Sequence, residues 1–128
     1  SEQDITTESK KSLISKNAQI IIANWEMAII ENLIHHINNT IDYGPYITSG
    51  TLSNYQTSWS KMKAYALALQ FNPYSTLPLE SLEYINDQIS VRPDTRVNSV
   101  NGYLGDILRA RNVLQSHFGI PEEAIFNW

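Results

Sequence analysis

A carboxylate and an imidazole one helical turn apart are the side chains of this sequence best suited to chemistry. Glu31 and His35 are four residues apart, so a helix would place them on the same face. Oxygen and nitrogen ligands of this kind bind divalent metals or iron, and a third ligand, His117 or Asp106, would come from another helix. The alternative is an ordinary pair in which Glu31 accepts a hydrogen bond from His35. We favour the ordinary pair.

Asparagines extend the same stripe at a spacing of one heptad. Asn17, Asn24 and Asn38 fall on the helical face of Glu31. Asparagines in such positions bind a ligand or, as we favour here, fix the register of packed helices. His36 is turned toward the apolar side and is expected to be buried or half-buried.

Other catalytic patterns are missing from the sequence. With no cysteine, the chain has no disulfide, no thiolate metal site and no cysteine nucleophile. Serine-nucleophile motifs, phosphate loops and dinucleotide fingerprints are also absent. Arg109 and Arg111 suit either an anion site or a structural ion pair, and we favour the ion pair. We therefore assign no catalytic residue.

Apolar residues at helical spacing predict the elements that would position these side chains. A long helix over about residues 14–41 is apolar on most sides, so we expect neighbours to enclose it. Asp42, Gly44 and Pro45 would end it. Further helices are predicted over about residues 52–71, 78–89 and 99–118, with a short helix or turn after Pro121 and a docked C-terminal tail. The expected core residues are Ile14, Ala18, Ile20, Ile21, Ile22, Ala23, Trp25, Met27, Ala28, Ile29, Ile30, Leu33, Ile34, Ile37, Ile41, Leu52, Tyr55, Trp59, Met62, Ala66, Leu69, Leu79, Leu82, Ile85, Ile89, Val100, Tyr103, Leu104, Ile107, Leu108, Leu114 and Phe118.

These elements predict an all-α, up-down bundle of four main helices around a long central first helix. Residues 1–128 would form one domain, because 128 residues with 42% hydrophobic side chains suffice for a single core. The spacing of Gly102 and Gly105 predicts close approach of another helix.

The number and distribution of charged residues limit the kinds of partner that the chain is expected to bind. Only 17% of residues are charged, so we expect another protein to cover part of the surface. The net charge is −4 and the basic residues are scattered, which argues against nucleic acid. Polar residues such as Asn24, Glu31 and His35 interrupt the apolar segment, which argues against a transmembrane span. If the chain is half of a larger domain, Trp25, Tyr55 or Trp128 would lie in an exposed apolar patch and a homodimer is possible.

Four stretches resemble the C-terminal part of a family of bacterial surface lipoproteins of uncharacterised function, whose helical bundle is similar to that of imelysin-like peptidases. The stretches are Ile34-His35-His36-Ile37-Asn38, Trp59 with Met62-Lys63, Leu69-Gln70-Phe71-Asn72-Pro73, and Arg109-Ala110-Arg111 with Leu114-Gln115 and Asn127-Trp128. The resemblance implies a helical domain, export to the cell surface or periplasm, a lipid anchor outside this chain, and a longer parent protein. The imelysin-type Gly-x-His-x-x-Glu motif is not present.

Two functions follow as hypotheses. The first is a non-catalytic binding or interaction domain of an exported surface lipoprotein, with Asn24, Glu31, His35 and Asn38 as candidate ligand contacts and no cofactor. Its partner would be the rest of the parent protein or another surface protein. The second is an iron-linked or other metal-binding protein of imelysin type, with Glu31 and His35 as metal ligands.

Overall fold

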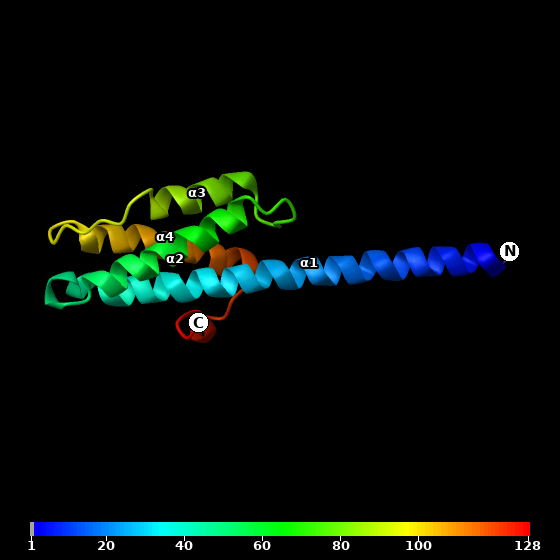
Figure 1. Ribbon diagram of the computed structural model, residues 1–128, viewed down its shortest axis with the longest axis horizontal. Coiled ribbons are helices and arrows are strands. Elements are labelled where there is room, and N and C mark those ends of the chain that lie inside the picture. The colour runs from blue at the N-terminus through cyan, green and yellow to red at the C-terminus, as the bar shows by residue number, and fades with distance from the viewer. Residues whose placement is uncertain (1) are drawn as a thin grey trace.

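The helices form a bundle from which half of the first helix projects (Figure 1). A computed structural model describes residues 2–128, and their side chains from Thr6 on. In chain order the elements are α1 (Glu2–Tyr43), the 3-10 helix η1 (Gly44–Ser49), α2 (Leu52–Gln70), α3 (Leu79–Ile89), α4 (Val100–Phe118) and α5 (Glu122–Ile125). The described residues include no strand. The predicted all-α bundle of four main helices is confirmed.

Helix α1 is much longer than its partners. It has 42 residues, or about 63 Å, whereas α2 and α4 have 19 residues each, or about 28 Å. The shorter helices therefore cover only the second half of α1, and residues 6–21 are all exposed. The prediction that neighbours enclose residues 14–41 is wrong for the first half. Ile14, Ile21 and Trp25 are 69%, 66% and 67% exposed, although Ile29 is buried as predicted.

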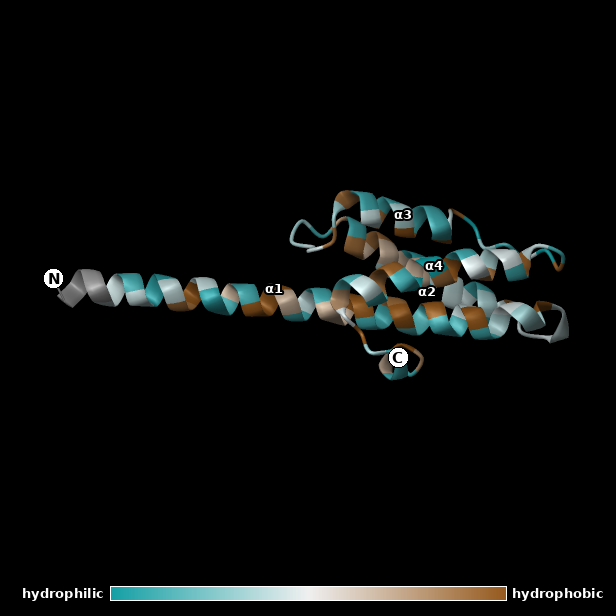
Figure 2. Ribbon diagram, turned by 180° about the vertical axis from the view of Figure 1, so that it is seen from behind, coloured by the Kyte–Doolittle hydropathy of each residue, from teal (hydrophilic) through white to brown (hydrophobic). Residues whose placement is uncertain are grey.

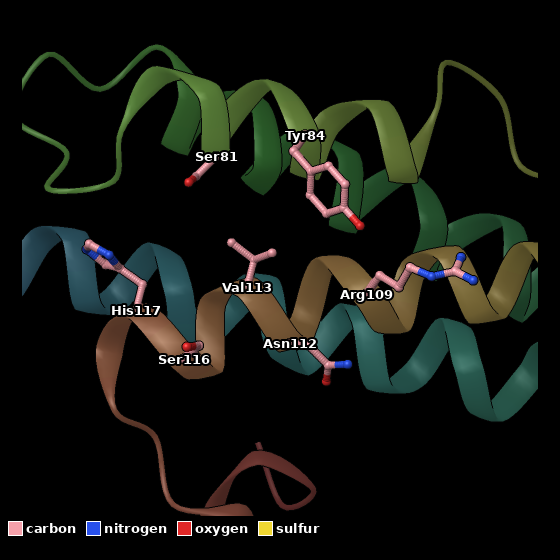
Figure 3. A pocket seen from close by; sticks show the side chains of 7 residues that line it. All are labelled: Ser81, Tyr84, Arg109, Asn112, Val113, Ser116 and His117. Atoms are coloured by element: carbon pink, nitrogen blue, oxygen red, sulfur yellow. The ribbon is translucent and has the colours of Figure 1, made fainter.

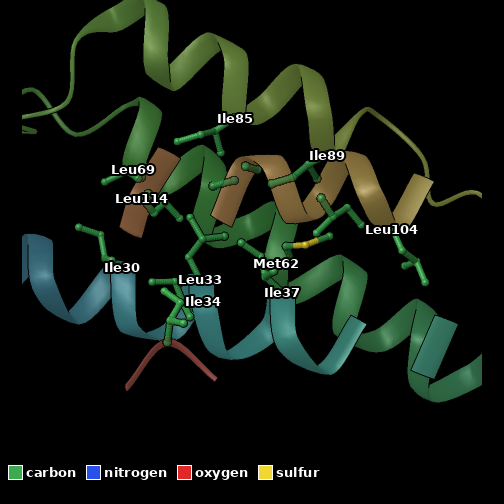
Figure 4. Close-up of a cluster of buried hydrophobic side chains, with 14 of the residues drawn as sticks. Ile30, Leu33, Ile34, Ile37, Met62, Leu69, Ile85, Ile89, Leu104 and Leu114 are labelled. Atoms are coloured by element: carbon green, nitrogen blue, oxygen red, sulfur yellow. The ribbon is translucent and has the colours of Figure 1, made fainter. Parts of the chain in front are cut away.

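The core lies between the second half of α1 and helices α2 to α4 (Figure 4). From α2, Tyr55, Met62, Ala66 and Leu69 are buried, as their three-and-four spacing predicts. Outside α1, three predicted core residues are exposed, because each lies at the edge of its helix's apolar side: Leu52 at the start of α2, Leu79 in the first turn of α3, and Leu108 of α4. The buried residues in Figure 4 include Ile30, Leu33, Ile34, Ile37, Met62, Leu69, Ile85, Ile89, Leu104 and Leu114.

One glycine permits close packing, and it is not in α4. A Cβ on Gly44, the first residue of η1, would lie 2.6 Å from one methyl carbon of Leu104 and 2.8 Å from the other. A Cβ on Gly102 or on Gly105 would meet nothing within 4 Å. The prediction that these two glycines admit a neighbouring helix is therefore wrong. The α4 face that carries them is not packed against another helix.

The C-terminal tail docks on the bundle as predicted. Ile125 of α5 is buried, and Trp128 packs partly buried against the core. None of the helices in residues 2–128 combines the length and the hydropathy needed to cross a bilayer.

Candidate functional site

The projecting half of α1 carries an exposed apolar face. Hydrophobic residues recur along this half of the helix, where the ribbon carries brown bands in Figure 2. Besides Ile14, Ile21 and Trp25, Leu13 is 59% and Ile20 is 49% exposed. Two asparagines lie among them. We call this surface the free face of α1; it comprises Leu13, Ile14, Asn17, Ala18, Ile20, Ile21, Asn24 and Trp25, all of them exposed.

The free face does not continue the side of α1 that packs in the bundle. At about 100° per residue, Glu26, Ile30 and Ile37 define the bundle side, and the free face is turned well away from it. Further along α1, the rotational position of the free face is occupied by exposed polar residues, Glu31, Asn32 and His35. The bundle therefore does not account for the apolar residues of the free face.

A small apolar pocket adjoins the free face where α1 enters the bundle. Its volume is about 300 Å³, and it is lined by Ile21, Ile22, Trp25, Asn72, Pro73 and Tyr74. Tyr74 is 63% exposed, so the apolar surface extends onto the connection between α2 and α3. Asn72 Oδ1 accepts a 3.0 Å hydrogen bond from the Tyr74 amide. The Nδ2 atom of Asn72 is buried and has no hydrogen-bond partner within the described residues.

A buried carboxylate holds this connection in place. Glu26 is 3% exposed. Its Oε1 atom accepts hydrogen bonds from Ser75 Oγ at 2.9 Å, from the Thr76 amide at 2.9 Å and from Thr76 Oγ1 at 3.2 Å. Thr76 Oγ1 also lies 3.2 Å from His117 Nε2 of α4. Glu26 thus joins α1, the α2–α3 connection and, through Thr76, α4. The sequence around Glu26 does not reveal this role, since the partners of Glu26 are about fifty residues away.

The predicted metal pair is on the surface. Glu31 and His35 are both exposed, and His35 Nε2 lies 3.2 Å from Asn39 Nδ2. The predicted third ligands have other neighbours: His117 contacts Thr76, and Asp106 pairs with Arg109. The described residues contain no group of three or more His, Asp or Glu side chains suited to a metal ion. Metal binding at Glu31 and His35 stays a prediction.

The three asparagines spaced seven or fourteen residues apart on α1 differ in burial. Asn17 and Asn24 are exposed on the free face. Asn38 is buried, and its amide donates to the carbonyls of Ile125 at 2.8 Å and Trp128 at 3.2 Å. Its Oδ1 atom accepts a 2.6 Å hydrogen bond from Arg111 Nη1. In this arrangement Asn38 fixes the position of the C-terminal tail, as a register-setting asparagine would.

The two arginines of α4 also differ in burial. Arg109 is exposed and pairs with Asp106 one turn earlier. Arg111 is 7% exposed, and its guanidinium carbon lies 4.8 Å from the centroid of the Phe126 ring. Burial lowers the pKa of Arg111, partly opposed by the charge of Asp42. The Arg111 Nε atom has no hydrogen-bond partner among the described residues.

A second, open groove of about 520 Å³ lies between α3 and α4 (Figure 3). Ser81 and Tyr84 extend from α3 toward α4, which contributes Arg109, Asn112, Val113, Ser116 and His117. The three-and-four spacing of these α4 residues is the sequence signal for this groove, although the residues were not predicted as a site. Because Asp106 already pairs with Arg109 and Thr76 contacts His117, the groove holds no cationic group without a neighbour.

Aromatic side chains support the connection between α3 and α4. Tyr55 donates a 2.8 Å hydrogen bond to the carbonyl of Asp94, and Trp59 donates a 2.6 Å hydrogen bond to the hydroxyl of Tyr103. Burial raises the pKa of Tyr103 to about 12. The hydrogen bond from Arg96 is the main reason that the pKa of Asp94 falls to about 2. These shifts accompany structural hydrogen bonds, so we assign no acid–base role to them.

Comparison with known proteins adds no family. No protein-family model matches the sequence, and searches of curated proteins and of solved structures also return no match. The class of the protein is therefore defined by its own geometry, an all-α bundle with one projecting, partly apolar helix.

Proposed function

We propose that the chain is a non-catalytic interaction domain whose free face binds another protein. One observation carries this proposal: five large hydrophobic side chains on one half of a helix are 49% to 69% exposed, and none of them packs in the core of the bundle. Exposed apolar surface of this extent is typical of protein interfaces, since a monomer gains no stability from it.

Two further features support an interaction role. Tyr74 extends the apolar surface beyond α1, since it lines one pocket with Ile21 and Trp25. The next two residues, Ser75 and Thr76, are hydrogen-bonded to Glu26, which ties this part of the surface to α1. Aromatic residues are also the type most enriched at the centres of interfaces.

We further propose that the domain belongs to an exported bacterial surface lipoprotein, with the lipid anchor elsewhere in its parent protein. The support is the resemblance of residues 34–38, 69–73 and 109–111, with Trp59 and the final Asn127-Trp128, to that family. Digestion of intact cells with an added protease tests this part. We expect the full-length protein to be cleaved. Complete protection until the cells are lysed would contradict surface exposure.

Photochemical cross-linking in the producing cells tests the interaction role. Replacing Ile21 of the full-length protein with benzoylphenylalanine should give a discrete protein adduct on illumination. Gln19 is equally exposed but lies on the opposite side of the same helix, so the same replacement there is the matched control and should give little adduct. Equal yields at both positions, or none at Ile21, would overturn the interaction role.

A further inference from the structure

We infer that the occupant of the free face is a second copy of this chain, with the two α1 helices packed antiparallel so that residue 20 of one lies opposite residue 21 of the other. This inference rests on the proposed interaction role and names its partner. It follows from how polar, charged and apolar residues are distributed along α1.

The two asparagines fix the register. Asn17 and Asn24 are seven residues apart near the middle of the free face, where any covering helix would desolvate them. In the inferred register, Asn17 of each copy lies opposite Asn24 of the other, because both pairs are equally far from the two-fold axis. An asparagine amide both donates and accepts, so each pair can satisfy itself. A purely apolar partner would leave both amides without hydrogen bonds.

Charges agree with the same register. Lys10 lies on the free-face side of α1, and in this arrangement it lies opposite Glu31 of the second copy. Within the described part of the chain, neither Lys10 nor Glu31 forms an ion pair. The two-fold symmetry produces the Lys10–Glu31 contact twice. Opposite charges at both ends and paired asparagines nearer the centre make the surface self-complementary.

Apolar contacts complete the arrangement. Ile20 and Ile21 of both copies meet at the two-fold axis, and Trp25 of one copy lies between Ile14 and Ala18 of the other, beside the apolar pocket that Trp25 and Tyr74 line. The paired stretch, residues 6–35, is about 45 Å long. Five large side chains from each copy become covered along this length, which suits an interface above the roughly 1,000 Å² that a specific contact requires.

The surface of α1 within the bundle leaves space for the N-terminal part of the second copy's α1. Its residues 6–13 would run beside residues 28–35 of α1, where Ala28, Glu31, Asn32 and His35 are all exposed. On one side of this strip His36 stacks on Tyr65 of α2, with ring centroids 5.6 Å apart. On the other side Asn38 holds the C-terminal tail. The strip between them stays open, and it has the same rotational position on α1 as the free face.

Sedimentation equilibrium of the purified chain tests the inference first. We expect a dimer, and we expect Ile21→Lys to make it monomeric while circular dichroism shows the helical content of a folded bundle. Gln19→Lys places the same charge on the opposite side of α1 and should leave the dimer intact. A monomer at all concentrations, or a dimer that Ile21→Lys does not affect, overturns the inference. A photo-adduct from Ile21 to a different protein, with a monomeric purified chain, would keep the interaction role and reject the second copy.

The absence of native cysteine allows a test of register. Mixing Asn17→Cys with Asn24→Cys chains should give a disulfide between the two, whereas Asn24→Cys alone should give none, because its two copies would be about 10 Å apart along the axis. An efficient Asn24→Cys homodimer disulfide would indicate a parallel pair and overturn the register. Lys10→Glu and Glu31→Lys should each weaken the dimer about three- to tenfold, and the double reversal should restore it. Failure of the double reversal to restore affinity would also count against the register.

Discussion

Arg111 donates a hydrogen bond of 2.6 Å to Asn38, and this contact joins α4 to α1 at the place where the C-terminal tail docks. Both side chains are buried, and the amide of Asn38 donates onward to two carbonyls of the tail. A cation is therefore kept in the interior by neutral groups, the Asn38 amide oxygen and the ring of Phe126. Such an arrangement makes Asn38 hard to replace.

We expect Asn38→Ala to destabilise the protein by about 2–4 kcal/mol, because it removes three hydrogen bonds and leaves a buried guanidinium without its acceptor. Urea denaturation followed by circular dichroism measures the loss. Limited proteolysis should also cut the tail sooner. Asn39→Ala is the control, since its half-buried side chain has its hydrogen bond to the exposed His35 and should change stability by less than about 0.5 kcal/mol.

Glycine substitutions in two helices should act in opposite directions. Gly44→Ala places a methyl group against the buried Leu104, which has to move, and we expect a loss of about 1–3 kcal/mol. Gly105→Ala meets open space inside α4 and should stabilise the protein by about 0.5–1 kcal/mol through helix propensity. Thermal unfolding of both variants is the measurement. Stabilisation by Gly44→Ala would contradict the close contact with Leu104.

Glu26→Ala should release the connection between α2 and α3. It deletes the acceptor of three hydrogen bonds from Ser75 and Thr76, and we expect a loss of about 2–3 kcal/mol. Hydrogen exchange should show the amide of Thr76 losing protection. Glu83→Ala removes an exposed carboxylate from α3, away from the inferred dimer contact, and serves as the control for stability. Equal effects of the two substitutions would count against the anchoring role.

His36 should make stability depend on pH. Burial of its ring, helped by the charges of His35 and Lys61, lowers the pKa of His36 from its ordinary 6.5. Below that value the unfolded chain binds a proton that the folded chain does not, so this contribution is fully present above pH 6.5 and is lost as the pH falls below it. Denaturation at about pH 7.5 and about pH 5.5 should show the loss, and His36→Gln should reduce it. His35→Gln should have a smaller effect, because burial is the larger cause.

Elemental analysis of the desalted protein tests the metal hypothesis. Glu31 and His35 supply two exposed ligands, which leaves at least two positions of a tetrahedral ion to water. We therefore expect less than about one tenth of an equivalent of zinc or iron. One full equivalent that disappears in a Glu31→Ala, His35→Ala double variant would instead support the imelysin-type alternative.

Much of the fold follows from local sequence signals. The spacing of Met62, Ala66 and Leu69 gives α2 and its buried side, and Pro78 and Pro121 mark where α3 and α5 begin. These features depend on neighbours a few residues away, which a sequence displays directly. The docked tail was also predictable, from its tryptophan.

Local sequence signals did not predict that Trp25 is exposed. Periodicity shows that Ile21, Trp25 and Ile29 share a side of the helix, but it does not show how far the other helices reach along it. Trp25 is 67% exposed although its neighbour Glu26 is buried, because Trp25 is turned further from the bundle side of α1 than Ile29 is. For Asn38 and Glu26, the deciding contacts come from residues about ninety and about fifty positions away. The sequence therefore identifies Asn38 and Glu26 as polar residues, but it does not show which segments they hydrogen-bond.

The hydrogen bonds of Glu26 have a mechanical consequence. Glu26 lies where the projecting half of α1 joins the bundle, so its hydrogen bonds hold the base of that projecting half. Ser75 and Thr76 resist a sideways force on the projecting half through their hydrogen bonds to Glu26. Part of this force is transmitted to α4, because Thr76 also contacts His117. Tension or bending applied to the arm would accordingly strain the α2–α3 connection before it disturbed the remainder of the bundle.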